Sequence, residues 1–189
     1  KSFLATISNA ILLVIIGALI TAVIQSSSVM TSVAITMVVT GLISLDQGIF
    51  LTMGSNIGSC VVAIIAGMSR GRNAKRTALI HLIFNVAGVI LFMIIGKVIS
   101  LCTGGDVTFG SIFAGMFPGA PQTQLAMFHT VFNVITVIII TPLNKVMVNL
   151  LTKLIPDEHT EKEDNPWGRR LYFIDDNMLK TPPVAIKQV

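Results

Sequence analysis

A run of four polar side chains lies inside a long apolar stretch near the start of the chain. The four residues are Gln25, Ser26, Ser27 and Ser28. Hydrocarbon offers no water to backbone or hydroxyl groups, so a polar cluster at membrane depth must face protein, an aqueous cavity or a bound solute. Polar groups at that depth are typical of functional sites. We therefore interpret this run, the polar tetrad, as a candidate solute-binding site.

A second polar interruption occurs in the next apolar segment. It consists of Gly54, Ser55, Asn56, Gly58 and Ser59. Each glycine costs about 1 kcal/mol of helix stability relative to alanine, and glycine-interrupted segments indicate solute sites in membrane transporters. The pattern predicts a discontinuous span over 47–69, with half-helices on both sides of an unwound stretch. The alternative is a continuous helix that packs closely on a neighbour through Gly54 and Gly58.

An HxxFNV motif appears twice, beginning at His81 and again at His129. The histidine and the asparagine of each copy, His81 with Asn85 and His129 with Asn133, share one helix face. They can act as a proton relay or as solute ligands, or they can hold helices together through hydrogen bonds. We favour the structural role, because both copies lie near the start of a span, where polar groups are less costly.

The composition indicates a membrane protein that is built from helices. Of the 189 residues, 53% are hydrophobic and only 12% are charged, whereas about a quarter are charged in soluble domains. A membrane-spanning helix needs about 20 apolar residues. The apolar blocks predict an all-α bundle with a re-entrant hairpin over 3–43, the discontinuous span over 47–69, and spans over 77–101 and 125–152. The hairpin would have the polar tetrad at its tip, and one long kinked span is the alternative.

The placement of basic residues predicts how the chain crosses the membrane. One loop gathers Arg70, Arg72, Lys75 and Arg76, whereas the loop over 103–124 has neither lysine nor arginine. Because basic residues favour cytoplasmic loops, we expect 70–76 and the tail over 153–189 to be cytoplasmic. The protein is then a multi-pass integral protein of the plasma membrane, in contact with lipid. No basic stripe with interleaved aromatic residues indicates nucleic-acid binding.

The remaining reactive residues indicate neither a resident metal nor an enzyme. Cys60 and Cys102 lack the spacing of a metal site, and the adjacent acids Asp175 and Asp176 have no further ligands beside them. The serines of the tetrad, with His81 or His129, raise the alternative of an intramembrane serine hydrolase. No GxSxG motif accompanies them, so we assign no catalytic residue and no organic cofactor.

The polar tetrad, the segment 41–45 and the segment 54–58 together resemble the sodium-dependent phosphate cotransporter family, that is, the type II group with its bacterial relatives. The resemblance covers about residues 1–152 and implies two inverted repeats, each with a QSSS hairpin. This chain has one tetrad and is similar to the second repeat. The first repeat would then come from the rest of the same protein or from a second copy. The segment 173–183 is similar to the lead-in to a cytosolic PhoU-like helical domain.

The resemblance also implies a site for an anion and a cation. Phosphate would bind Gln25, Ser26, Ser27 and Ser28, and sodium would bind Ser28, Thr31, Ser32, Ser55, Asn56 and Ser59. Hydroxyl groups suit both ions, because each donates one hydrogen bond and accepts two, and sodium is a hard cation that prefers oxygen ligands. Family members commonly have threonine where this chain has Cys60, which removes one hard ligand.

The function implied by the resemblance is sodium-coupled symport of inorganic phosphate by alternating access, with sodium as the coupling ion. The alternative is a membrane anchor or sensor that docks a cytosolic phosphate-signalling domain through its tail. Because the chain begins with Lys1, we also expect it to be part of a longer protein.

Overall fold

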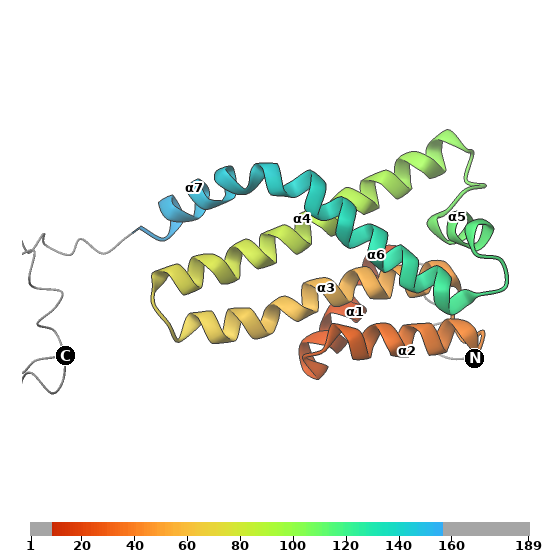
Figure 1. Ribbon diagram of the computed structural model, residues 1–189, viewed down its shortest axis with the longest axis horizontal. Coiled ribbons are helices and arrows are strands. Elements are labelled where there is room, and N and C mark those ends of the chain that lie inside the picture. The colour runs from red at the N-terminus through yellow and green to blue at the C-terminus, as the bar shows by residue number, and fades with distance from the viewer. Residues whose placement is uncertain (1–8, 157–189) are drawn as a thin grey trace, which may run out of the picture. The chain divides into compact units, whose positions relative to one another are not determined.

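The computed structural model describes residues 9–156, and all regular secondary structure in that part is helical (Figure 1). The elements are α1 (Ala10–Ile24), α2 (Ser27–Val39), α3 (Leu45–Met68), α4 (Arg72–Cys102), α5 (Phe109–Met116), α6 (Pro121–Ile140), the 3-10 turn η2 (Thr141–Leu143) and α7 (Asn144–Leu154). Three stretches are long and apolar enough to cross a membrane, namely Leu45–Met68, Arg72–Cys102 and Pro121–Leu154. The prediction of an all-α membrane protein is confirmed. The predictions for the tail beyond 156 and for the first residues of the hairpin lie outside the described residues.

The first two helices form the hairpin, and the chain breaks at the polar tetrad as predicted. The backbone of Gln25 is left-handed, with φ of 60°, and no other non-glycine residue of the described part has a positive φ. The Ser26 side chain then caps α2 by accepting from the Val29 amide at 3.4 Å. With 15 and 13 residues, the two arms are each shorter than the roughly 20 residues of a span.

The predicted discontinuity in the third segment is wrong. α3 is one continuous helix of 24 residues that runs through 54–59. The hydroxyl groups of Ser55 and Ser59 donate back to the carbonyls of Thr52 and Asn56, each at 2.7 Å, so they need no unwound backbone. The alternative, close packing through glycine, is what the structure has.

The glycines of α3 let its backbone touch the backbone of α1. A Cβ atom on Gly54 would lie 2.0 Å from the Val14 carbonyl oxygen, and one on Gly58 would lie 2.3 Å from the Ala18 carbonyl oxygen. Such distances leave no room for a side chain. Burial against α1 therefore outweighs the helix propensity that the glycines lose, which is about 1 kcal/mol each.

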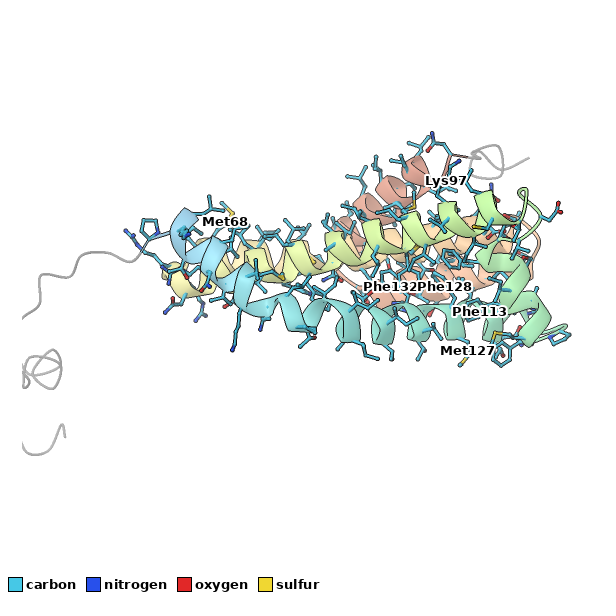
Figure 2. The ribbon with its side chains drawn as sticks, turned by 90° about the horizontal axis from the view of Figure 1, so that it is seen from above. Met68, Lys97, Phe113, Met127, Phe128 and Phe132 are labelled. Carbon is cyan, nitrogen blue, oxygen red and sulfur yellow. The ribbon has the colours of Figure 1, made fainter. Side chains whose placement is uncertain are left out.

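The core between α4, α5 and α6 is aromatic. Phe92 on α4 packs edge-on against Phe132 on α6, with the ring centroids 4.7 Å apart. Phe128, one turn earlier on α6, packs against Phe109 and Phe113 of α5, at 5.5 Å in both cases. Figure 2 shows Phe128 and Phe132 pointing into the space between the helices. This cluster fixes α6 beside α4 and thereby sets which residues of α6 reach α3.

At each end of the bundle a charged side chain makes hydrogen bonds that hold two helices together. At one end, the Asp46 carboxylate of α3 accepts from the Thr108 hydroxyl at 2.9 Å and from the Gly110 amide at 2.8 Å, which holds the start of α5. At the other end, the Arg76 guanidinium of α4 donates twice to the Ile155 carbonyl that follows α7. These contacts hold α5 against the start of α3 and the end of α7 against α4.

Candidate functional site

The hairpin tip brings two opposite helix ends together. α1 ends at Ile24 and α2 begins at Ser27, with only Gln25 and Ser26 between them. The last carbonyls of α1 and the first amides of α2 have no partner within their own helices. A helix C-terminus favours a cation and a helix N-terminus favours an anion. The tip therefore presents acceptors and donors next to each other without any charged side chain.

The side chains of the tetrad are accessible in this part of the protein. Gln25 and Ser28 are exposed, and Ser26 and Ser27 are half-buried. The hydroxyl oxygens of Ser26 and Ser28 lie 3.2 Å apart and share a hydrogen bond. The four predicted phosphate residues are thus consecutive around one turn of the chain, and none of them is fully buried.

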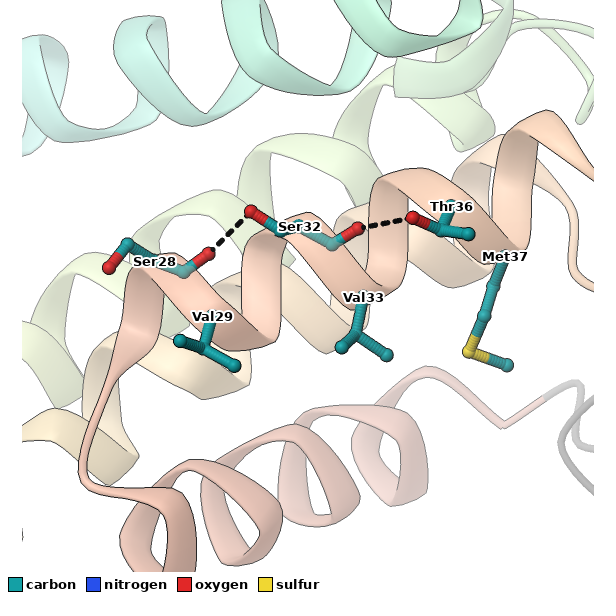
Figure 3. A pocket seen from close by; sticks show the side chains of 6 residues that line it. All are labelled: Ser28, Val29, Ser32, Val33, Thr36 and Met37. Atoms are coloured by element: carbon teal, nitrogen blue, oxygen red, sulfur yellow. Dashed lines mark hydrogen bonds between the residues drawn. The ribbon is translucent and has the colours of Figure 1, made fainter.

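A groove of about 440 Å³ continues from the tetrad along α2. Figure 3 shows the hydroxyl groups of Ser28, Ser32 and Thr36 on one side of the helix, whereas Val29 and Val33 point toward α1. The Ser32 hydroxyl donates to the Ser28 carbonyl, and the Thr36 hydroxyl donates to the Ser32 carbonyl, both at 2.9 Å. These bonds use the donors and leave oxygen lone pairs facing the groove. The structure therefore brings Ser28 and Ser32, two predicted sodium residues, onto one surface.

Thr31 lies on a buried face of α2, away from the groove. Its side chain is 9% exposed, and its hydroxyl oxygen has no hydrogen-bond partner. The two helices run in opposite directions (Figure 1), and Gly48 of α3 lies against Val38 of α2. Counted seven residues along each helix from that contact, or about 10 Å at 1.5 Å per residue, Thr31 and Ser55 are expected at the same level. The predicted sodium residues of α2 are therefore split between two faces.

Asn56 on α3 is the centre of a polar network with α6. Its amide nitrogen donates to Asn133 Oδ1 at 3.2 Å, and its amide oxygen accepts from His129 Nε2 at 3.1 Å. Of its predicted partners on α3, Ser55 is fully buried and Ser59 is half-buried. The hydrogen bonds of the three side chains run within α3 or to α6.

The two HxxFNV motifs hold α3 from two neighbouring helices. Asn133 donates to the His129 carbonyl at 2.8 Å, and Asn85 donates to the His81 carbonyl at 2.9 Å, so the two copies have the same local geometry. The α6 copy binds Asn56, and the α4 copy contacts Cys60 one turn further along, where the Asn85 amide lies 3.3 Å from the sulfur. The interhelical hydrogen bonds that the structural interpretation expects are present for His129, Asn133 and Asn85.

Thr21 is a polar residue of this region that sequence reasoning missed. It lies in the last turn of α1, its side chain is fully buried, and its hydroxyl oxygen has no hydrogen-bond partner. A Cβ atom on Gly58 would lie 2.7 Å from the Thr21 Cβ. The signal that could have found it is its spacing of one helical turn before Gln25, which keeps it close to the tip.

Comparisons with known proteins agree with the resemblance. A family model described as Na+/Pi-cotransporter matches residues 1–117. The uncharacterized protein YqeW of Bacillus subtilis (strain 168) is 43% identical over 79 residues, which are 42% of this chain and 26% of that protein. The human sodium-dependent phosphate transport protein 2B is 39% identical over 85 residues, or 43% of this chain and 12% of that protein. The human protein 2C is 40% identical over 88 residues, or 44% and 15%.

The matches have a limited extent. The matched part of the chain spans about a quarter or less of the length of these curated relatives. No solved structure matches the chain significantly.

Proposed function

The chain belongs to the Na+/Pi-cotransporter family, and from this premise we propose that the protein carries inorganic phosphate across the plasma membrane together with sodium. The family is one of transporters, and the chain has no enzymatic role. The observation that carries the proposal is the meeting of the α1 C-terminus and the α2 N-terminus at the polar tetrad. Discontinuous helices of this kind bind anions at helix N-termini and cations at helix C-termini in secondary transporters.

Phosphate binds at the start of α2 in this proposal. The anion accepts hydrogen bonds from the first amides of the helix and from the hydroxyl groups of Ser26, Ser27 and Ser28, while the Gln25 amide donates from the other side. The helix N-terminus favours negative charge. No lysine or arginine is needed at this depth, because the accompanying sodium offsets the charge of the phosphate.

Sodium binds to uncharged oxygens on the sides of the tip. We assign Ser28 and Ser32 from the groove along α2, Thr31 from the buried face of α2, and Ser55, Asn56 and Ser59 from α3. The last two serines donate within their own helix and keep lone pairs, and the Asn56 amide oxygen keeps one beyond its bond with His129. The expected shared level of Thr31 and Ser55 supports a cation shell that α2 and α3 form together.

Transport by alternating access needs a second half. We propose that residues 1–152 are one repeat, and that the other repeat comes from the rest of the protein or from a second copy. The loop over 70–76 and the tail over 153–189 are cytoplasmic in this arrangement, and the tail leads to a PhoU-like domain.

Uptake of labelled phosphate into proteoliposomes that contain the full-length protein tests this function. We expect uptake with an inward sodium gradient and none when choline replaces sodium. Ser27→Ala should abolish uptake, and so should Gln25→Gly, which removes the amide but suits the left-handed backbone. The matched control is Ser69→Ala, because that exposed hydroxyl bonds only to the Ala66 carbonyl at the far end of α3. Uptake by Ser27→Ala with unchanged sodium dependence would defeat the assignment.

A further inference from the structure

Three buried hydroxyl oxygens have no hydrogen-bond partner in the described part of the chain, and they belong to Thr21, Thr31 and Thr136. Other threonines in these helices donate to the carbonyl one turn earlier, as Thr52 does to Gly48 at 2.8 Å. A buried hydroxyl that lacks a partner carries a desolvation penalty. Each of the three therefore calls for a ligand or for a reason to remain unpaired.

Two of the three flank the polar tetrad within the hairpin. Thr21 is one turn before Gln25 and lies against Gly58, where α1 and α3 touch through their backbones. Thr31 is one turn into α2 and is expected at the level of Ser55 of α3. Thr136 instead lies against Gly88, between α6 and α4. The two threonines of the hairpin are thus both buried, one on each arm and each about one helical turn from the tip.

The end of α1 beside Thr21 provides hydrogen-bond acceptors, and no positively charged side chain lies near it in the sequence. The backbone amide of Gln25 donates to the Thr21 carbonyl at 2.6 Å. The carbonyls of Ala22, Val23 and Ile24 follow at the helix end. Carbonyls at a helix C-terminus carry partial negative charge. No lysine, arginine, aspartate or glutamate occurs between residues 2 and 45. An uncharged, oxygen-rich pocket of this kind suits a hard cation.

We propose that Thr21 Oγ1 is a ligand of the transported sodium, which binds on the α3 side of the hairpin tip with Thr31 Oγ1 and the last carbonyls of α1. The inference rests on the proposed function and adds a residue to its sodium site. The ion supplies the missing partner of both buried hydroxyl groups.

Thr21→Val tests the proposal, because valine has the shape of threonine without the oxygen. In proteoliposomes with the full-length protein, the sodium concentration for half-maximal phosphate uptake should rise roughly tenfold or more, as expected for the loss of one bond to a charged ligand. The phosphate KM at saturating sodium should stay near that of the wild type. Thr21→Ser keeps a hydroxyl and should restore the sodium response.

Thermal unfolding of the purified protein supplies a readout that does not depend on transport. A ligand that binds the folded state raises the melting temperature, so sodium should stabilise the wild type, with choline as the ionic-strength control. Thr21→Val should melt no lower than the wild type without sodium, since it removes an unpaired hydroxyl, and should lose the sodium-dependent rise. Thr136→Val removes the third unpaired hydroxyl and should keep that rise in full.

The possible outcomes separate the two proposals. A wild type without sodium-dependent uptake contradicts the proposed function, and the melting experiment still tests sodium binding at Thr21. Thr21→Val with wild-type sodium half-saturation and a wild-type sodium-dependent rise overturns the inference. If the valine variant does not fold, Thr21→Cys replaces the hard oxygen with a soft sulfur and must show the same loss of sodium response.

Discussion

The face of α3 that packs on α1 and the face that packs on α4 and α6 are held by different physical means. Toward α1 the contact is backbone against backbone, and a Cβ atom on Gly17 of α1 would lie 2.2 Å from the Leu51 carbonyl oxygen of α3. Toward α4 and α6, the side chains of Asn56 and Cys60 meet the two HxxFNV motifs through polar contacts.

The difference teaches how much change each face tolerates. Close packing without side chains has no volume to spare, because the atoms that an added methyl group would meet are backbone atoms that cannot rotate away. A hydrogen bond between membrane helices contributes about 0.6 kcal/mol on average, so losing one pair is a small loss unless it leaves buried partners unpaired. The glycine face should therefore respond to size and the polar face to partner chemistry.

The polar face contains a second comparison, between the two motifs. They share the HxxFNV sequence and the bond from asparagine to the histidine carbonyl. In the α6 motif, Asn133 accepts a hydrogen bond from the Asn56 amide and His129 donates one to it. The α4 motif meets the Cys60 thiol, which is a weak hydrogen-bond partner. Two identical motifs thus hold α3 with different strength, because their hydrogen-bond partners on α3 differ.

The largest effect is expected from Gly54→Ala on the glycine face. The new methyl group would meet the Val14 carbonyl oxygen at 2.0 Å, so α1 must move away from α3. Overpacking of this kind typically costs about 1–3 kcal/mol and occasionally more. Size-exclusion chromatography of heated full-length protein should show a lower melting temperature or no folded protein. Gly115→Ala is the control, since a Cβ there meets nothing within 4 Å, and equal melting of the two variants would contradict the contact.

Asn56→Leu is expected to have the next largest effect, because it removes the partner of both His129 and Asn133. A polar group that is left unpaired in a buried position costs about 1–3 kcal/mol, and because His129 is half-buried and Asn133 is exposed, the loss should lie near the lower end of that range. The same melting assay, in buffer without sodium, should show a clear decrease. Ser59→Ala is the matched control on α3, since it loses only a bond to the Asn56 carbonyl. If both variants melt alike, the network does not hold α6.

Double-mutant cycles should measure the difference in coupling energy between the two HxxFNV motifs and α3. The cycle of Asn56 with Asn133 should give a coupling of about 0.6 kcal/mol, the average for hydrogen bonds between membrane helices. The cycle of Cys60 with Asn85 should give a smaller coupling, because its acceptor is sulfur. Leucine at the asparagines and alanine at Cys60 suit the two cycles. A larger coupling at Cys60 would reverse the order that we infer.

The smallest effect is expected from Cys60→Ser, at the contact between α3 and the α4 motif. The hydroxyl is a better acceptor for the Asn85 amide, but its smaller volume loosens the packing of a side chain that is fully buried. The two changes oppose each other, so the free energy of unfolding should change by no more than about 0.5 kcal/mol, and the melting temperature should change little. A large loss of stability would show that the volume of the sulfur, and not its hydrogen bond, is what α4 needs.

Local signals in the sequence predicted much of the fold and part of the site. Apolar blocks of sufficient length predicted α3, α4 and the α6–α7 arm, because a hydrocarbon layer needs about 20 apolar residues. The polar tetrad predicted the break between α1 and α2, since consecutive serines compete for the backbone bonds of a helix. Its roles toward phosphate and sodium stay predictions that the uptake experiments test.

Only the tertiary structure decided whether Gly54 and Gly58 unwind α3 or pack it on α1. A glycine weakens a helix by about 1 kcal/mol through its own backbone, and this term can be read from the sequence. The opposing term is the close contact with Val14 and Ala18, which lie about 40 residues earlier in the chain. Likewise, Asn56 finds His129 and Asn133, and Thr21 is buried without a partner, only once distant helices pack together. The sequence by itself thus determined which segments are long and apolar enough to cross a membrane and where the hairpin breaks, because those terms are local. The pairing of polar groups between helices depends on contacts that only the packed fold creates.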